Sequence, residues 1–290
     1  MAAAEPATLG DLLSHARQRL VESGSDSPRL DAEVLLRHLL HLDRAHLLVS
    51  LDRPAPPWLA GRFDALVERR AAGEPVAYIT GQREFMGLDF LVDRRVLIPR
   101  PETEFLVEWG SRRLRRDSGR SHRGRLVVDV GTGSGAIIVS LAALTEPRLG
   151  TVFVGADISR EAIEVARLNA ARLAPGRVEL LVGNLLSWCR RPADLILANL
   201  PYLRPEQLHE GIEREPEAAL LSGEDGFDHY RRLLARLPET LAGSGACICE
   251  IDPSQRKFAL RASRTATPNR RISVLPDLAG FDRYLVIEPR

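Results

Sequence analysis

The chain of 290 residues is long enough for two domains, one of which could have an α/β core of ordinary size. Its composition, 44% hydrophobic and 27% charged, is typical of a soluble globular protein, and no apolar run approaches the roughly 20 residues of a membrane span. A net charge of +1 provides no overall field for a polyphosphate, so a nucleic-acid partner would need a local basic patch.

The amino-terminal segment reads MAAAEPATLGDLLSHARQRL and has no basic stretch followed by an apolar core, so it does not resemble a secretory signal. Glu5 and Asp11 argue against a transit peptide, because transit peptides are poor in acidic residues. Thr8 and Asp11 have the spacing of a helix capping box, which predicts a helix beginning near residue 9. We therefore expect a cytoplasmic protein.

Residues 8 to 72 have leucine, alanine and valine at helical spacing throughout. Turn residues and prolines interrupt this pattern at residues 24–28 and 53–57. Pro56 and Pro57 are expected in the first turn of the helix that follows, where proline is tolerated. Residues 1–73 are therefore predicted to form a small all-helical domain.

From Pro75 to Ile98 the pattern changes to short runs rich in Val, Ile, Phe and Tyr, separated by Gly81 to Arg83 and by Gly87. Runs of this composition with glycine between them predict a β-hairpin. Residues 74–98 are therefore expected to be a connector.

Four arginines, at positions 112, 113, 115 and 116, gather in the sequence SRRLRRD. We interpret them as the solvated end of a helix, and a docking patch for nucleic acid is the alternative.

Beyond residue 124, apolar runs of strand length alternate with helical patterns. The runs are RLVVDV, TVFVGAD, VELLVG, DLILAN and GACICEI, and the helices are expected at residues 135–145, 159–173 and 227–242. This alternation predicts a parallel sheet with helices on both faces, an α/β fold. The cysteines at 189, 247 and 249 have no metal-binding or disulfide spacing, so we expect small buried side chains and no metal site.

The first of these strands leads through a glycine turn directly into an amphipathic helix, in the sequence RLVVDVGTGSGAIIVSLAAL. Gly131, Gly133 and Gly135 allow a tight turn and a close approach of ligand to the main chain, while the helix presents free N–H groups. These features predict a nucleoside-bearing cofactor. Gly131, Gly133 and Ala136 also satisfy the looser dinucleotide pattern, so the turn alone leaves both cofactor classes open.

Two acidic residues accompany the glycine turn. Asp157 ends the next strand, where its carboxylate can accept hydrogen bonds from both ribose hydroxyls of a nucleoside; capping the helix that begins near Ser159 is its structural alternative. Asp129 lies inside the first strand, where a carboxylate is costly unless a cation or several donors meet it. S-adenosylmethionine carries two cationic groups and a dinucleotide carries a pyrophosphate, so Asp129 favours the methyl donor.

The strand DLILAN ends in Asn199, Leu200, Pro201 and Tyr202, at the edge where open α/β sheets bind ligands. An amide nitrogen is a poor nucleophile, so a site that methylates it must hold the NH₂ group with two acceptors and aim its lone pair. Asn199 can supply one acceptor and the carbonyl of residue 200 the other. Pro201 biases residue 200 towards an extended conformation, and Tyr202 can provide an aromatic wall.

These motifs resemble those of the release-factor glutamine N5-methyltransferases, the HemK/PrmC family, and the resemblance extends over nearly the whole chain. The most characteristic stretch is LIPRPETE, Leu97 to Glu104. Other matching stretches are PRLDAEVLLRHLL, VVDVGTGSGAI, GADIS, NLPY, EPEAALLSGEDGFDHYRRLL, CEIDPSQ and DLAGFDRYLVIEP.

The resemblance implies a Rossmann-like, seven-stranded class I methyltransferase domain over residues 99–290, with an antiparallel last strand, preceded by the helical domain, which would help to recognise the partner. It implies that S-adenosyl-L-methionine is the cofactor and that it is held by Gly131, Thr132, Gly133, Ser134, Gly135, Asp157, Asn184, Leu185 and Asn199. It implies that Asn199, Leu200, Pro201 and Tyr202 hold the substrate. The implied substrate is the glutamine of the Gly-Gly-Gln loop in class 1 peptide chain release factors.

Two positions depart from the family pattern. Leu200 stands where the family usually has proline, and because only its backbone carbonyl is needed we expect activity to survive. Asn184 stands where the family usually has aspartate, and its amide oxygen can still accept from an adenine amino group. Leu185 replaces a commonly aromatic neighbour, which weakens any expectation of stacking there.

Four other functions remain as alternatives. The first is methylation of a glutamine in a ribosomal protein, which is the closer rival. The second is methylation of an exocyclic amine of a nucleic acid, which poses the same lone-pair problem but requires a binding track for the nucleic-acid backbone. A binding module without turnover is the third. A nicotinamide dehydrogenase is the fourth, and it would leave Asn199 to Tyr202 without a function.

Overall fold

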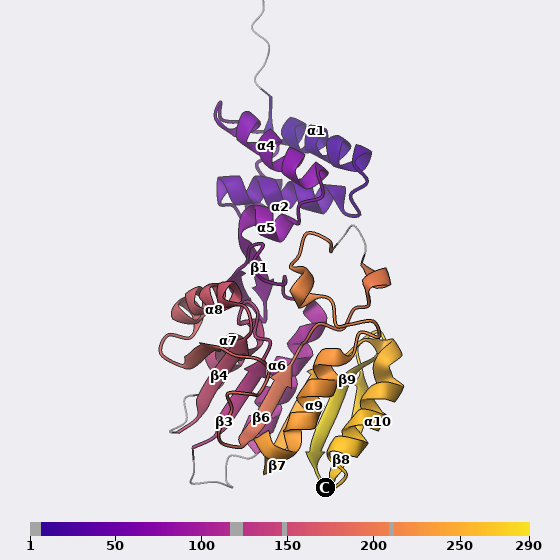
Figure 1. Ribbon diagram of the computed structural model, residues 1–290. Coiled ribbons are helices and arrows are strands. Elements are labelled where there is room, and N and C mark those ends of the chain that lie inside the picture. Colours follow the sequence, from indigo (N-terminus) through magenta and orange to yellow (C-terminus); the bar gives the residue numbers. More distant parts are fainter. Residues whose placement is uncertain (1–6, 117–123, 147–149, 209–211) are drawn as a thin grey trace, which may run out of the picture. The chain divides into compact units, whose positions relative to one another are not determined.

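The computed structural model describes residues 7–116, 124–146, 150–208 and 212–290, and the chain forms two compact units, Met1–Gln82 and Arg83–Arg290 (Figure 1). The boundary between the units lies inside the segment that the sequence predicts as a connector. In the described ranges, no helix has the length and apolar character needed to cross a membrane.

The first unit consists of helices. Thr8 caps the first of them with a reciprocal capping box, in which the Asp11 N–H donates to Thr8 Oγ1 at 3.1 Å and the Thr8 N–H donates to Asp11 Oδ2 at 2.8 Å. This confirms the helix start predicted near residue 9. The helices are α1 (Leu9–Glu22), α2 (Pro28–Leu40), α3 (Arg44–Leu48), α4 (Leu59–Ala71) and α5 (Val76–Thr80).

The apolar faces of these helices form a core of their own, which includes the fully buried Leu20, Leu36 and Phe63. Pro28 is the first residue of α2. The prediction that Pro56 and Pro57 lie in a first helical turn is wrong, because α4 begins later, at Leu59. The Leu59 N–H donates to the Pro56 carbonyl at 2.9 Å, so the two prolines form a turn before the helix.

The predicted hairpin is present but shorter than its segment: β1 (Gln82–Phe85) pairs with β2 (Leu88–Leu91) across Met86 and Gly87, which both have positive φ. Residues 76–80 form α5, so the prediction of an extended chain there is wrong. The Pro75 carbonyl accepts from the N–H groups of Tyr78 and Ile79, and this local turn outweighs the strand-like composition.

The second unit contains a sheet in the strand order β5-β4-β3-β6-β7-β9-β8, in which β9 runs antiparallel to its neighbours β7 and β8 (Figure 1). This confirms the predicted seven-stranded methyltransferase sheet with an antiparallel last strand. The strands are β3 (Leu126–Val130), β4 (Val152–Asp157), β5 (Val178–Val182), β6 (Ala193–Ala198), β7 (Leu241–Glu250), β8 (Arg270–Pro276) and β9 (Asp282–Pro289).

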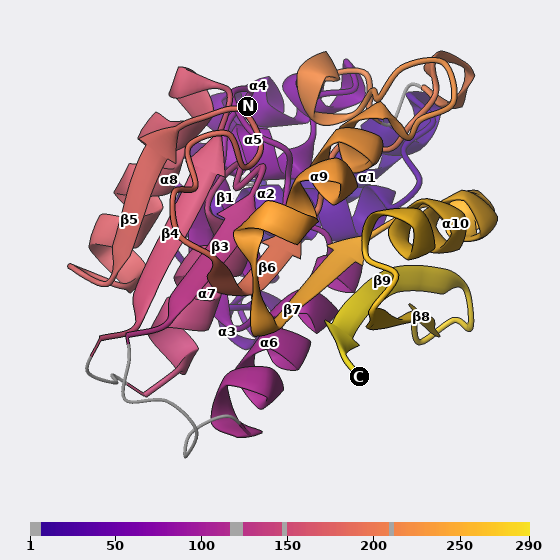
Figure 2. The same ribbon diagram turned by 60° about the horizontal axis from the view of Figure 1, so that its bottom comes forward.

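Helices cover both faces of this sheet (Figure 2). On one face α6 contacts α7, which contacts α8, and on the other face α9 contacts α10. These helices are α6 (Glu104–Arg116), α7 (Ala136–Leu144), α8 (Arg160–Leu173), α9 (Asp228–Thr240) and α10 (Arg256–Ala266). The loops between them contain the short helical turns η1 (Pro101–Thr103), η2 (Pro205–Gln207), η3 (Glu217–Ala219) and η4 (Pro253–Gln255).

The sheet brings the ends of three strands together. β3 pairs in parallel with β4 on one side and with β6 on the other, with Val130 opposite both Ala156 and Ala198. The residues that follow these strands therefore meet at one edge, the carboxyl edge, as in other open α/β sheets. Cys247 and Cys249 are buried in β7 with their sulfur atoms 3.6 Å apart, as their alternation predicts.

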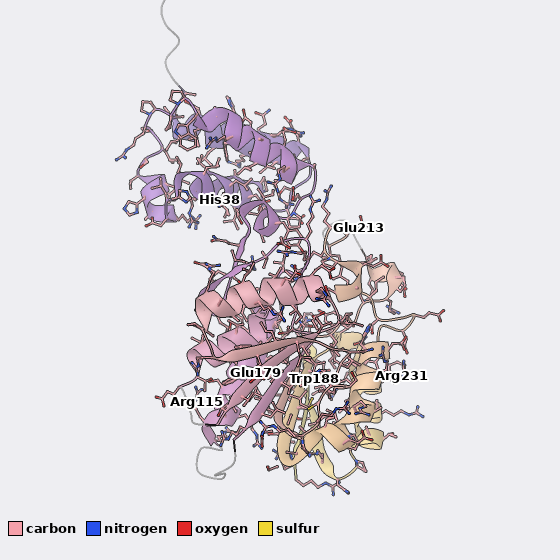
Figure 3. The ribbon with its side chains drawn as sticks, turned by 60° about the vertical axis from the view of Figure 1, so that its left-hand side comes forward. His38, Arg115, Glu179, Trp188, Glu213 and Arg231 are labelled. Atoms are coloured by element: carbon pink, nitrogen blue, oxygen red, sulfur yellow. The ribbon has the colours of Figure 1, made fainter. Side chains whose placement is uncertain are left out.

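The arginine cluster lies at the opposite edge of the sheet. It ends α6, where the Leu114 carbonyl accepts from Arg125 at 2.8 Å, just before β3 begins; Arg115 is labelled in Figure 3. Arg113 donates to the Ser244 carbonyl and Arg115 to Ser111 Oγ within the same unit. These contacts agree with the end of a helix and separate the cluster from the residues at the carboxyl edge.

Candidate active site

The glycine turn connects β3 to α7 at the carboxyl edge. The N–H groups of Gly131 and Thr132 both donate to the Ala156 carbonyl, at 2.8 and 3.0 Å, and this fixes the turn against the end of β4. Gly131 and Gly133 have φ of +73° and +53°, which favour glycine. A Cβ on Gly131 would lie 2.7 Å from Leu200 Cδ2, whereas one on Gly133 would meet no atom of the described residues within 4 Å. The turn is closed on its inner side and open at Gly133.

Asp157 lies across from this turn. Its carboxylate accepts from the Gly133 N–H and from the Ser159 N–H, each at 2.9 Å. Burial raises the pKa of Asp157, and hydrogen bonds from the backbone N–H groups of Ser159, Gly133 and Ile158 oppose that shift. Ser159 caps α8 with its own side chain, so Asp157 is not required as the side-chain cap. Each carboxylate oxygen keeps a lone pair for a ligand hydroxyl.

Asp129 is completely buried one strand away. Its Oδ2 accepts from the Thr132 hydroxyl at 2.6 Å, while its Oδ1 has no hydrogen-bond partner among the described residues. The pKa of Asp129 is raised to about 7, mainly by burial and also by the nearby Asp157 carboxylate, while the Thr132 hydroxyl and the Ile138 N–H act to lower it. A buried carboxyl with an unpaired oxygen beside an open glycine turn suits a ligand that carries positive charge.

Asn184 and Leu185 follow β5 at the same edge. Asn184 Oδ1 accepts from Arg232 at 3.0 Å, so the amide oxygen expected to face an adenine is shared with an arginine of α9. Leu185 has a φ of +50°, and its carbonyl accepts from the indole N–H of Trp188 at 2.8 Å. Trp188 is labelled in Figure 3. These contacts hold a tight turn whose side chains border the cavity described below.

Asn199 and Leu200 follow β6 and are held by hydrogen bonds. Asn199 Nδ2 donates to Thr103 Oγ1 at 2.9 Å. The Leu200 N–H donates to Tyr230 Oη at 3.0 Å, and Tyr230 is completely buried. The Leu200 side chain is itself buried, 3% exposed, and packs in the core of the sheet. The residue that departs from the family pattern thus has its N–H hydrogen-bonded, which proline could not provide.

One cavity brings these residues together. Its wall includes Gly131 and Gly133 after β3, Asp157 at the end of β4, Asn184 and Leu185 after β5, and Asn199, Leu200 and Pro201 after β6. Thr132, Ser134 and Gly135 are buried behind the turn and do not line the cavity, and neither does the buried Asp129. Tyr202 also lies outside the lining; its hydroxyl donates to Glu250 Oε1 at 3.4 Å, so its action as an aromatic wall stays a prediction.

Four side chains that hold this site had no role in the sequence analysis: Thr103, Glu215, Tyr230 and Glu250. Thr103 Oγ1 donates to Glu250 Oε2 at 2.8 Å. Glu215 accepts from the Ile98 N–H at 2.9 Å and forms an ion pair with Arg100. All four belong to stretches that carry the family resemblance, LIPRPETE, EPEAALLSGEDGFDHYRRLL and CEIDPSQ, which was the signal available for them.

Two family models match parts of the chain. Residues 11–81 match the model described as PrmC N-terminal domain, and residues 121–256 match the model described as Methyltransferase domain.

Curated relatives match nearly the full length. A protein of Moorella thermoacetica named "Release factor glutamine methyltransferase" is 41% identical over 281 residues, which cover 95% of this chain and 96% of the relative. A protein of Deinococcus radiodurans with the same name is 37% identical over 281 residues, covering 96% of this chain and 97% of the relative. Among solved structures, the hMettl16 catalytic domain in complex with a 3′UTR hairpin is 14% identical, with a TM-score of 0.54, covering 77% of this chain and 80% of that one. At this identity the structure supports the fold alone.

Proposed function

The chain belongs to the release factor glutamine methyltransferase family, and from this premise we propose that it methylates the side-chain amide nitrogen of the glutamine in the Gly-Gly-Gln loop of class 1 peptide chain release factors. The chain is an S-adenosylmethionine-dependent methyltransferase. The single observation that carries the proposed substrate chemistry is that Asn199 shares a cavity with Gly133 and Asp157.

The residues of the glycine turn fit S-adenosylmethionine. The open position at Gly133 admits a ligand against the main chain, Asp157 offers acceptors for ribose hydroxyls, and Asp129 Oδ1 is a buried acceptor without a partner among the described residues. The bound cofactor would supply a methyl group on a positively charged sulfur, ready for transfer to a nucleophile. Asn184 and Leu185 line the same cavity, and we expect them to border the base of the cofactor.

The substrate amide requires two acceptors because its nitrogen lone pair is delocalised into its own carbonyl. Asn199 Oδ1 can accept from one N–H of the glutamine side chain and the Leu200 carbonyl from the other. Among the residues that the structure describes, no protein group donates to Asn199 Oδ1. Tyr230 approaches the Leu200 carbonyl at 3.4 Å but donates its one proton more closely to the Glu250 carbonyl, so the Leu200 oxygen stays available.

The site needs no strong base for this reaction. A bond forms between the amide nitrogen and the methyl carbon as the bond from that carbon to sulfur breaks. The nitrogen then carries an acidic proton, which water can accept. The residues around it therefore act by orientation and by hydrogen bonding, contributions that can supply several kcal/mol when groups are held in advance.

Two variants separate the roles of Asn199 and Asp157. Asn199→Ala removes one substrate acceptor, so we expect kcat on a release factor to fall by roughly 10²- to 10³-fold while the Kd for S-adenosylmethionine changes far less. Asp157→Ala should weaken cofactor binding first. Radiolabelled methyl transfer measures kcat, and calorimetry measures Kd. Equal losses of cofactor affinity in both variants would contradict these assignments.

The curated relatives named for release factors support a release factor over a ribosomal protein as the substrate. The near-neutral chain and the position of the arginine cluster at the far edge of the sheet argue against a nucleic-acid substrate, so no direct nucleic-acid partner is proposed. We propose no membrane partner either. Because release factors act on ribosomes, we place the protein in the cytoplasm.

A further inference from the structure

Two hydrogen bonds connect Asn199 to a buried carboxyl group. Asn199 Nδ2 donates to Thr103 Oγ1 at 2.9 Å, and Thr103 Oγ1 donates to Glu250 Oε2 at 2.8 Å. Thr103 is 4% exposed and Glu250 is 1% exposed, and neither lines the cavity that contains Asn199. Thr103 belongs to the LIPRPETE stretch in η1, and Glu250 is the last residue of β7.

The donors and acceptors in this chain set its direction. An ionised Glu250 can only accept, so Thr103 must give it the one hydroxyl proton that it has. The Thr103 oxygen can then only accept from Asn199, which must present its NH₂ group. The two ends of an amide have nearly the same shape, so packing alone would not choose between them. Asn199 Oδ1 is thereby turned away from Thr103.

We propose that Thr103 and Glu250 are positioning residues that fix the polarity of the Asn199 amide, so that Asn199 presents an acceptor and not a donor to the substrate NH₂ group. This inference rests on the proposed function, because only an amide substrate requires an acceptor there. With the amide turned over, an NH₂ group would face an NH₂ group, and the substrate would lose one of its two acceptors.

The same strand end also holds the second acceptor. The Leu200 N–H donates to Tyr230 Oη, and Tyr230 donates to the backbone carbonyl of Glu250. The side chain of Glu250 thus orients the Asn199 amide while its main chain anchors the residue whose carbonyl is the other acceptor. Both acceptors depend on the end of β7.

Protonation of Glu250 would remove the constraint, since a neutral carboxyl can donate to Thr103 and let Thr103 donate to Asn199. The charged and polar groups that face Glu250 include Thr103 and Glu102 from η1, Tyr202 from the loop after β6, Tyr230 from α9, and Arg283 and Tyr284 from β9. Burial raises the pKa of Glu250 to about 7; Thr103, Arg283 and Tyr202 lower it and Glu102 raises it.

The test compares Thr103→Val, which keeps the shape and removes the hydroxyl, with Thr103→Ser, which keeps the hydroxyl. Thr267→Val is the matched control, because Thr267 is also buried and its hydroxyl donates to a backbone carbonyl, that of Ser263 in α10. Glu250→Gln, whose amide can donate to Thr103, is the second variant. Each full-length protein is assayed for kcat and KM with a release factor, for the Kd of S-adenosylmethionine, and for its unfolding temperature.

We expect Thr103→Val and Glu250→Gln to lower kcat by about 10- to 100-fold, with the cofactor Kd unchanged and with Thr103→Ser and Thr267→Val close to wild type. In the wild type with saturating cofactor, kcat should rise with pH through the range around the Glu250 pKa of about 7 and then level off, and this rise should be absent from Glu250→Gln.

A folded Thr103→Val protein with wild-type kcat overturns the inference alone. If Thr103→Val does not fold, a wild-type kcat that is constant between pH about 6 and about 8 overturns it instead. A wild-type protein that binds cofactor but methylates no release factor overturns the proposed function, and the inference with it.

Discussion

At the level of single residues, the side chains that the sequence analysis singled out are those that follow strands. Asp157 and Asn199 each come at the end of an apolar run, and parallel strands bring such positions to one edge, so their meeting could be predicted. Thr103 and Glu250 could not be found in this way. The two residues are 147 positions apart, and Thr103 lies in a loop. Nothing in the sequence around either residue indicates that the Thr103 hydroxyl meets the Glu250 carboxyl group.

Asp129 provides a prediction about pH. Its pKa is raised to about 7 mainly by burial, and a cationic ligand beside it would favour the carboxylate, so the pKa should be lower in the complex. Cofactor binding then releases a proton below pH 7, and the affinity should increase as pH rises towards about 7 and level off above it, by up to about tenfold per pH unit.

Calorimetry at a series of pH values below and above about 7 measures the cofactor Kd of the wild type and of Asp129→Asn. The variant should show a weaker pH dependence, with the remainder due to Asp157, whose pKa is also raised by burial. The same slope in both proteins would show that Asp129 does not meet a cationic group.

At the level of elements, the loop after β6 is held between α9 and β7 by one phenol. Tyr230 accepts from the Leu200 N–H and donates to the Glu250 carbonyl, and all three residues are buried. Tyr230→Phe would leave a buried donor and a buried acceptor unpaired. The free energy of unfolding should fall by about 1–3 kcal/mol for each such group, as measured by chemical denaturation.

A second substitution checks the cause of this loss. Leu200→Pro introduces the residue usual in the family and removes the N–H that Tyr230 satisfies, so Tyr230→Phe should cost less stability in the Leu200→Pro background than in the wild type. If the effects of the two substitutions on the free energy of unfolding were additive, the hydrogen bond from the Leu200 N–H to Tyr230 would contribute nothing to stability.

Element types were predictable where an apolar period was long, as in α1 and in the five strands β3 to β7. Short elements were not. Residues 76–80 have the composition of a strand but form α5, because the Pro75 carbonyl accepts hydrogen bonds from the N–H groups of both Tyr78 and Ile79. Pro56 and Pro57 precede α4 instead of starting it, since proline suits a turn as well as a first helical turn.

At the level of the whole molecule, all the described residues that line the candidate cavity lie between Arg95 and Arg232, within the unit Arg83–Arg290. We propose that the unit Met1–Gln82, which has its own core, contributes to release-factor recognition. A chain without residues 1–82 should then bind S-adenosylmethionine with a Kd close to that of the full chain while its kcat/KM on a release factor falls. Loss of cofactor binding by a folded fragment would contradict this division of roles.

The balance of charge gives a prediction about partners. A net charge of +1, with the arginine cluster at the far edge of the sheet, predicts that an RNA oligonucleotide does not compete with the protein substrate. Methyl transfer should be the same with and without the oligonucleotide at low salt. Strong inhibition that disappears at high salt would favour a nucleic-acid substrate.

The central claim is that a glutamine side-chain amide is held between Asn199 and the Leu200 carbonyl beside the cofactor pocket. Mapping the methylated residue tests it most directly: the protein is incubated with S-adenosylmethionine and a class 1 release factor, and the digested product is sequenced by tandem mass spectrometry. The account predicts one methyl group on the glutamine of the Gly-Gly-Gln loop. A methyl group on any other residue, or none from a folded protein that binds the cofactor, would contradict it.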